Sequence, residues 1–354
     1  MKLTSGLAAA AFSILALLAS APANAGDLYT VRGVHVDQTS KSATDARAIA
    51  QAQGQQLALG QLLKRLTLPE DWASLPQPDA KTAQDAVRGF QVASEKASAT
   101  RYIADLNVSF QPDTVKRMLA SRNIAYGETQ AKPALLLAVL QKADGTRILW
   151  EDQNPWRDAW SKLDLANAMT PVIMPLGDVQ EFSMVTPAQA ISGDKAALSA
   201  LVSRYGTDEV VVAYAVANAD GTKVDVTVTR YGAATSTPMK RSYQGAADTV
   251  LVTAADGVLL ALGDDWKHQI IVRGGEKASL TASAFYANLD QWEAIRKGLT
   301  STPLVQGIQV EGIASGGAEI QIDYRGTPDK LALSLAQQNI ALVQQEGGWS
   351  LRMK

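Results

Sequence analysis

The chain has 354 residues, of which 47% are hydrophobic and 19% are charged, and its formal net charge is −2. This composition is typical of a folded protein and too apolar for a disordered one, and the near-neutral charge argues against nucleic acid and anionic lipid as partners. The chain contains no cysteine, which excludes disulfides, a cysteine nucleophile and the lipidated cysteine of a lipoprotein.

Residues 1–25 have the pattern of a secretory signal peptide. Lys2 gives a positive start, residues 7–19 are almost entirely apolar, and Ala23-Asn24-Ala25 places small residues before a cleavage point. The apolar run is too short to span a bilayer, and no later run reaches the length of a membrane helix. We therefore expect cleavage after Ala25 and a soluble, periplasmic protein without a transmembrane anchor.

A first module is expected at residues 28–127, with the element order β-α-β-β-α. Alternating apolar residues predict a strand at 29–36, and Ser42-x-x-Asp45 resembles a capping box before a long amphipathic helix. Residues 71–80 are expected to form a loop. Two strands are predicted at 90–97 and 101–110, followed by a short helix that Pro112 opens.

A second module is expected at residues 132–268, where strands alternate with helices. The continuous apolar run Ala134 to Leu140 predicts a strand buried on both faces, and residues 172–176 predict a second such strand. Asp220-Gly221 lies between two β-rich runs and indicates a hairpin. With a long helix at 249–266, this pattern predicts an α/β sandwich with one mixed sheet.

A third module is expected at residues 279–354, after a linker at 274–277. Asn288 and Thr327-Pro328 each predict a helix start, and alternating strands flank both helices. The resulting order, β-α-β-β-α-β, is the ferredoxin-like arrangement. The whole chain is therefore predicted to have an α+β fold with three modules.

The search for catalytic motifs is negative. His35 and His268 lie far apart, and neither a zinc-protease motif nor a nucleotide-binding loop is present. Ser192-x-x-Lys195 matches a serine–lysine motif in letters, but Ser192 and Asp194 are better explained as helix caps. The sequence therefore assigns no catalytic residue, and neither a metal nor a cofactor is expected.

Residues 150–160 hold three of the seven tryptophans of the chain. One interpretation is a groove that binds a glycan or a peptide through aromatic, charged and amide groups. Its residues would be Trp150, Asp152, Asn154, Trp156, Arg157 and Trp160. The favoured interpretation is that Trp156 and Trp160, one helical turn apart, anchor a helix to the core, with Asn154 as its cap.

Three segments together resemble a known family: residues 48–59, 101–110 and 149–160. They are similar to an exported proteobacterial family known as the domain of unknown function 2066. The resemblance covers the first two modules and implies a protein of the Gram-negative envelope. It implies no activity and no site residues.

The leading hypothesis is a non-catalytic periplasmic protein that acts as an interaction or assembly accessory of the envelope. Its partner would be another envelope protein or a cell-wall component. The alternative is a periplasmic ligand-binding protein with a tryptophan-lined groove, and the third hypothesis is a carboxylate-based hydrolase. An apolar surface patch would favour the first hypothesis, and convergent carboxylates in one deep pocket would favour the third.

Overall fold

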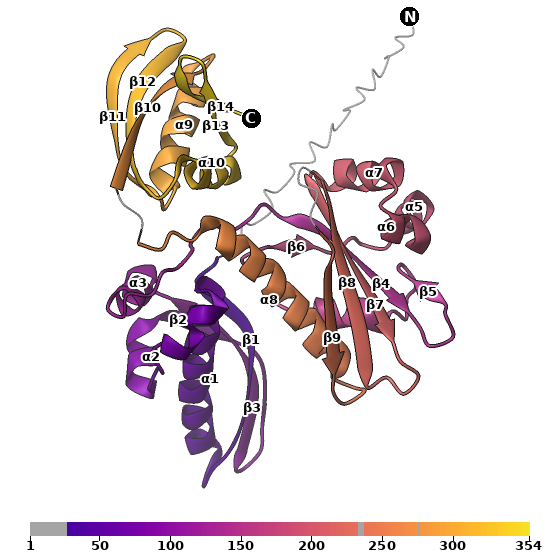
Figure 1. Cartoon of the computed structure of the whole chain (residues 1–354). Helices are drawn as coiled ribbons and strands as arrows, with labels where there is room; N and C mark the ends of the chain where they lie inside the picture. The colour runs from indigo at the N-terminus through magenta and orange to yellow at the C-terminus, as the bar shows by residue number, and fades with distance from the viewer. Residues whose placement is uncertain (1–26, 233–236, 275–276) are drawn as a thin grey trace, which may run out of the picture.

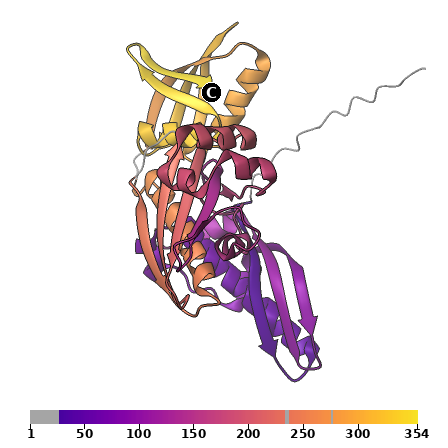
Figure 2. The same cartoon turned by 90° about the vertical axis from the view of Figure 1, so that its right-hand side faces the viewer.

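The computed structural model describes residues 27–232, 237–274 and 277–354. The predicted signal peptide, residues 1–25, lies outside the described residues. Three separate sheets, each accompanied by helices, follow one another along the chain (Figures 1 and 2). The predicted α+β class is thereby confirmed. Within the described ranges, every helix is too short or too polar to cross a membrane.

The first sheet is antiparallel and has the strand order β1-β3-β2. Its strands are β1 (Thr30–Thr39), β2 (Val87–Ala97) and β3 (Arg101–Phe110), and its helices are α1 (Ala43–Leu66), the 3-10 helix η1 (Pro69–Ser74), α2 (Ala80–Ala86) and α3 (Pro112–Ala120). The Ser42 side chain caps α1 by accepting from the Asp45 amide at 3.1 Å. The stretch expected to be a loop at 71–80 instead contains most of η1 and the start of α2.

The second sheet has the order β5-β4-β7-β8-β9, with β6 beside β4. Strands β6 and β7 run parallel to β4, and the other pairs are antiparallel, so the sheet is mixed, as predicted. The strands are β4 (Ala134–Gln141), β5 (Arg147–Ile148), β6 (Val172–Ile173), β7 (Glu209–Ala217), β8 (Lys223–Gly232) and β9 (Met239–Gln244).

Helices cover both faces of this second sheet (Figure 1). One face packs against α4 (Pro155–Ser161) and α8 (Val250–Ile270), and the other packs against a group of short helices. That group consists of α5 (Val179–Met184), α6 (Pro187–Ser192) and α7 (Lys195–Tyr205). The central strand β4 is therefore buried on both faces, which explains its unbroken apolar sequence.

The third sheet has the order β11-β12-β10-β14-β13 and carries two helices. Its strands are β10 (Lys277–Phe285), β11 (Val305–Ala314), β12 (Gly317–Arg325), β13 (Ile340–Gln345) and β14 (Gly348–Met353), and its helices are α9 (Leu289–Ser301) and α10 (Pro328–Gln337). The predicted β-α-β-β-α-β order is present, and its last part is a hairpin of two strands, β13 and β14. This last strand lies between β13 and β10 and runs parallel to β10.

Helix α8 connects the first two modules. Its N-terminal part packs on the second sheet, whereas Trp266 and Ile270 near its end belong to the core of the first module. The third module contacts the C-terminal end of α8. There the Lys330 ammonium donates a hydrogen bond to the main-chain oxygen of Ile271. Gln337 on α10 also accepts from the Lys132 amide at 2.8 Å.

Candidate functional site

The tryptophans of residues 150–160 are core residues. Trp156 and Trp160 are fully buried, and their rings meet edge to face with centroids 5.5 Å apart. The Trp156 indole donates to the main-chain oxygen of Ala213 at 2.9 Å, and the buried Trp150 indole donates to that of Val185 at 2.6 Å. This burial agrees with the core interpretation, and none of the three rings is open to a ligand.

The polar residues predicted to accompany these tryptophans stabilise the local chain. Asn154 caps α4 by accepting from the Trp156 and Arg157 amides. Arg157 donates to the main-chain oxygens of Pro175 and Leu176, and Asp152 lies exposed in the preceding turn. The cavity beside Trp150 and Arg157 holds about 10 Å³, which is scarcely enough for one water molecule.

The other residues singled out in the sequence do not form a catalytic centre. His35 pairs with Asp105 at 2.9 Å on an exposed sheet face, and His268 lies 3.7 Å from Glu70. Asp194 caps α7 by accepting from the Ala197 amide at 3.0 Å. In the part of the chain that the structure describes, no cluster of three or more acidic or histidine side chains could hold a metal ion.

Three large apolar side chains on and just before α5 are exposed. Leu176, Val179 and Phe182 are 75%, 88% and 59% exposed, and we call them the apolar triad. They are spaced three residues apart in the sequence, with Val179 and Phe182 on α5 and Leu176 before it. The sequence predicts a buried strand at residues 172–176, but β6 ends at Ile173 and Leu176 is exposed, so this prediction is wrong for the last three residues.

The apolar triad stands on a buried polar network. The fully buried carboxylate of Glu181 accepts from the main-chain amides of Gly177 and Asp178 and from the Tyr205 hydroxyl of α7. Asp178 in turn caps α5 by accepting from the Glu181 amide at 3.0 Å, which completes a capping box. A helix of six residues is thereby fixed to the domain, and its apolar side chains are displayed outward.

The rim of the apolar triad is polar and balanced in charge. Arg204 of α7 forms an ion pair with Asp178 and donates to Gln180 at 3.0 Å. The hydrogen bond from Arg204 holds the pKa of the Asp178 carboxyl below its usual value of 3.8. The pair therefore stays ionised at neutral pH and adds no net charge to this surface.

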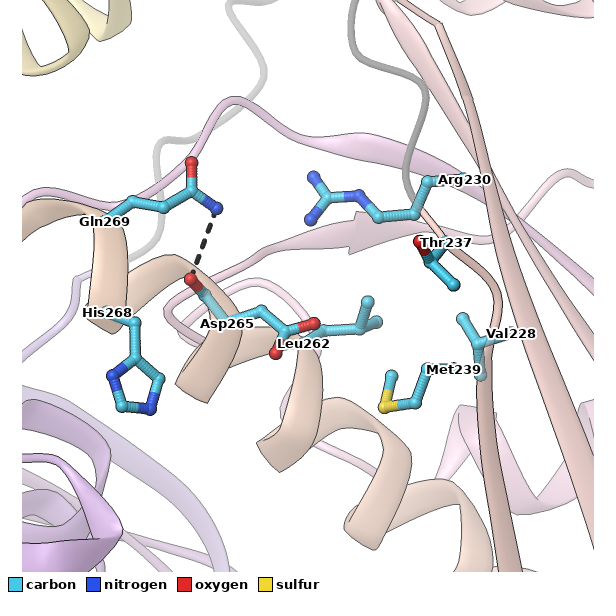
Figure 3. A pocket seen from close by; sticks show the side chains of 8 residues that line it. All are labelled: Val228, Arg230, Thr237, Met239, Leu262, Asp265, His268 and Gln269. Atoms are coloured by element: carbon cyan, nitrogen blue, oxygen red, sulfur yellow. Dashed lines mark hydrogen bonds between the residues drawn. The ribbon is translucent and has the colours of Figure 1, made fainter.

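A separate cavity of about 270 Å³ lies between α8 and the strands β8 and β9 (Figure 3). Its apolar side is lined by Val228, Met239 and Leu262, and its polar side is lined by Arg230, Thr237, Asp265, His268 and Gln269. These residues come from segments far apart in the sequence. The six residues predicted for a ligand site contribute nothing to this cavity.

Comparison with known proteins concerns the first module. A domain family described as a domain of unknown function, DUF8605, matches residues 24–128. This family differs from the domain of unknown function 2066, so the resemblance of the sequence to the latter stays a prediction. No curated protein matches the chain. The similarity thus covers the first sheet and its helices and includes neither the apolar triad nor the cavity.

Proposed function

We propose that this protein is a non-catalytic interaction or assembly accessory of the Gram-negative periplasm, and that the apolar triad is its docking surface. The observation that carries the proposal is the exposure of Leu176, just before α5, and of Val179 and Phe182 on α5, a helix that a buried carboxylate holds in place. Exposed apolar side chains of this size cost free energy in water, and three within seven residues of sequence favour a binding surface.

The occupant that fits this surface is another envelope protein. An apolar centre with a polar rim is the usual anatomy of a protein–protein interface. The Asp178–Arg204 pair is neutral overall, whereas attraction to an anionic membrane surface needs an excess of basic side chains. The predicted signal peptide supports a periplasmic location.

The hydrolase hypothesis has little support from the described residues. A glycosidase-type mechanism needs two carboxylates that face one substrate. The cavity beside α8 is lined by one carboxylate, Asp265, and both carboxylate oxygens of the nearby Glu209 accept from one guanidinium edge of Arg230, its Nε and Nη2.

Photo-crosslinking in cells tests the docking proposal. A photo-reactive amino acid replaces Val179, and the matched control replaces Asp220, which lies in an exposed turn of the same module. We expect a discrete adduct with a second protein from position 179 only, and its loss when Phe182→Ser is added. No adduct at position 179, an adduct with a second copy of this chain, or equal adducts at both positions would contradict the proposal.

A further inference from the structure

Arg230 interrupts an apolar row at the end of the cavity beside α8. On β8, Val224, Val226 and Val228 face α8 in alternation, and Arg230 takes the next position of the same row. Its Nε and Nη2 atoms donate to the carboxylate of Glu209 on β7. Nη1 has no partner among the described residues, although the Arg230 side chain is only 19% exposed.

Asp265 faces Arg230 from the opposite wall. The two side chains enter the same space from α8 and β8 (Figure 3), but they are too far apart to form an ion pair. Gln269 donates to the main-chain oxygen of Asp265 at 3.2 Å and leaves its carboxylate unengaged. His268, one turn away, also lines the cavity, and its Nε2 lies 3.7 Å from Glu70. A positive and a negative group thus face each other across open space.

The remaining wall and the size of the cavity limit what can bind there. Val228, Met239 and Leu262 provide an apolar surface beside the two charges. The volume of about 270 Å³ is near the lower end of the range for ligand sites, roughly 300–1,000 Å³. An occupant that engages both polar groups must therefore be small, must present an acceptor to Nη1 of Arg230 and a donor to Asp265, and must carry an apolar part.

We propose that this cavity binds a free aliphatic amino acid as its zwitterion. The α-carboxylate accepts from Nη1 of Arg230, the α-ammonium donates to the carboxylate of Asp265, and the aliphatic side chain packs against Val228, Met239 and Leu262. Guanidinium is suited to this role because its planar edge matches a carboxylate. Glu209 keeps the guanidinium oriented, so less side-chain freedom is lost on binding.

Calorimetric titration of the full-length exported protein tests this site. The probes are the L and D forms of valine, leucine and methionine, together with isoamylamine and 4-methylpentanoate, which each lack one charge of leucine. We expect at least one amino acid to bind with a dissociation constant below about 1 mM, and both single-charge analogues to bind at least about tenfold more weakly.

Asp265→Asn is the decisive variant, since Asp265 is exposed and its carboxylate supports no other described contact. It should weaken amino-acid binding at least about tenfold, whereas Asp248→Asn, at an exposed position before α8, should leave it unchanged. Arg230 is unsuitable for substitution, because its loss leaves Glu209 without its partner.

Three results would overturn the inference: no binding of any amino acid at about 10 mM, equal binding of isoamylamine, or equal affinity of the Asp265→Asn variant. None of them affects the apolar triad, which lies on the other face of the second sheet, so this inference and the docking proposal fail independently.

Discussion

Lys267 of α8 donates a hydrogen bond to the main-chain oxygen of Thr67, the residue that ends α1 in the first module. The same ammonium donates to the main-chain oxygen of Lys64 at 3.0 Å and pairs with Asp264 at 2.8 Å. Lys267 is only 2% exposed. It therefore satisfies carbonyl groups at a helix end that have no partner within the helix, and it joins two modules through a buried contact.

Lys267→Met should destabilise the protein by about 1–3 kcal/mol, because it leaves the carbonyls of Lys64 and Thr67 buried without a donor. Urea unfolding of the two proteins measures this difference. Lys240→Met, at an exposed position of β9, is the control and should change stability by less than about 0.5 kcal/mol. Equal effects of the two variants would show that the buried contact contributes nothing.

The contribution of Lys267 should also depend on pH. Burial lowers its pKa below the usual 10.5, despite the opposing effect of Asp264. Between the lowered pKa and 10.5, the unfolded chain holds a proton that the folded chain has released, so stability rises with pH in this window. The stability difference between wild type and Lys267→Met should therefore grow as the pH approaches 10.5. A flat difference would contradict the lowered pKa.

Trp156→Ala and Trp160→Ala should each cost about 3–5 kcal/mol, because both rings are fully buried and their removal leaves a cavity. Phe182→Ser offers the comparison with an exposed aromatic residue and should change stability by about 0.5 kcal/mol or less. The midpoints of urea unfolding give all three values. Nearly wild-type midpoints for both tryptophan variants would instead support a groove.

Glu181→Gln should loosen α5 without unfolding the domain. The buried carboxylate accepts from two main-chain amides and a hydroxyl. The side chain of glutamine has one acceptor oxygen in place of two, so it can accept only some of these hydrogen bonds. Hydrogen exchange of residues 177–184 should accelerate by about tenfold or more, which corresponds to about 1.4 kcal/mol of lost protection. Glu293→Gln on the exposed face of α9 is the control. Unchanged exchange at 177–184 would show that the Glu181 contacts do not hold the helix.

Gly26 should be the first residue of the protein recovered from cells. The apolar run and the small residues at Ala23 and Ala25 predict cleavage after Ala25. N-terminal sequencing of protein from an osmotic-shock fraction gives the answer. An intact Met1, or recovery with the membranes alone, would contradict export by a cleavable signal.

Much of the architecture is readable from local patterns. Period-3.6 apolar residues predict α1 and α8, the unbroken run at 134–140 predicts the buried strand β4, and Asp220-Gly221 predicts the β7–β8 hairpin. These signals suffice because burial of one face, or of both, dictates residue type at each position. Helix α2 was missed because seven residues carry too little periodicity to distinguish a helix from a loop.

Neither candidate site could be predicted from local sequence patterns. The cavity joins Arg230 to Asp265, which are 35 positions apart in the numbering and meet only through the packing of α8 on β8. The apolar triad had a local signal, since Asp178-x-x-Glu181 is a capping box. That signal predicts a helix, but it does not say that Leu176, Val179 and Phe182 stay in water. Their exposure depends on which neighbouring elements leave them uncovered.

The absence of cysteine allows the most direct test of the docking surface, because a single introduced thiol can be followed without background. The rate of maleimide modification of the Val179→Cys variant is compared between the purified protein and intact cells, with Asp220→Cys as the control. If a partner covers the apolar triad, position 179 should react at least about tenfold more slowly in cells, while position 220 reacts equally in both settings. Equal rates at position 179 in cells and in the purified protein would contradict the account.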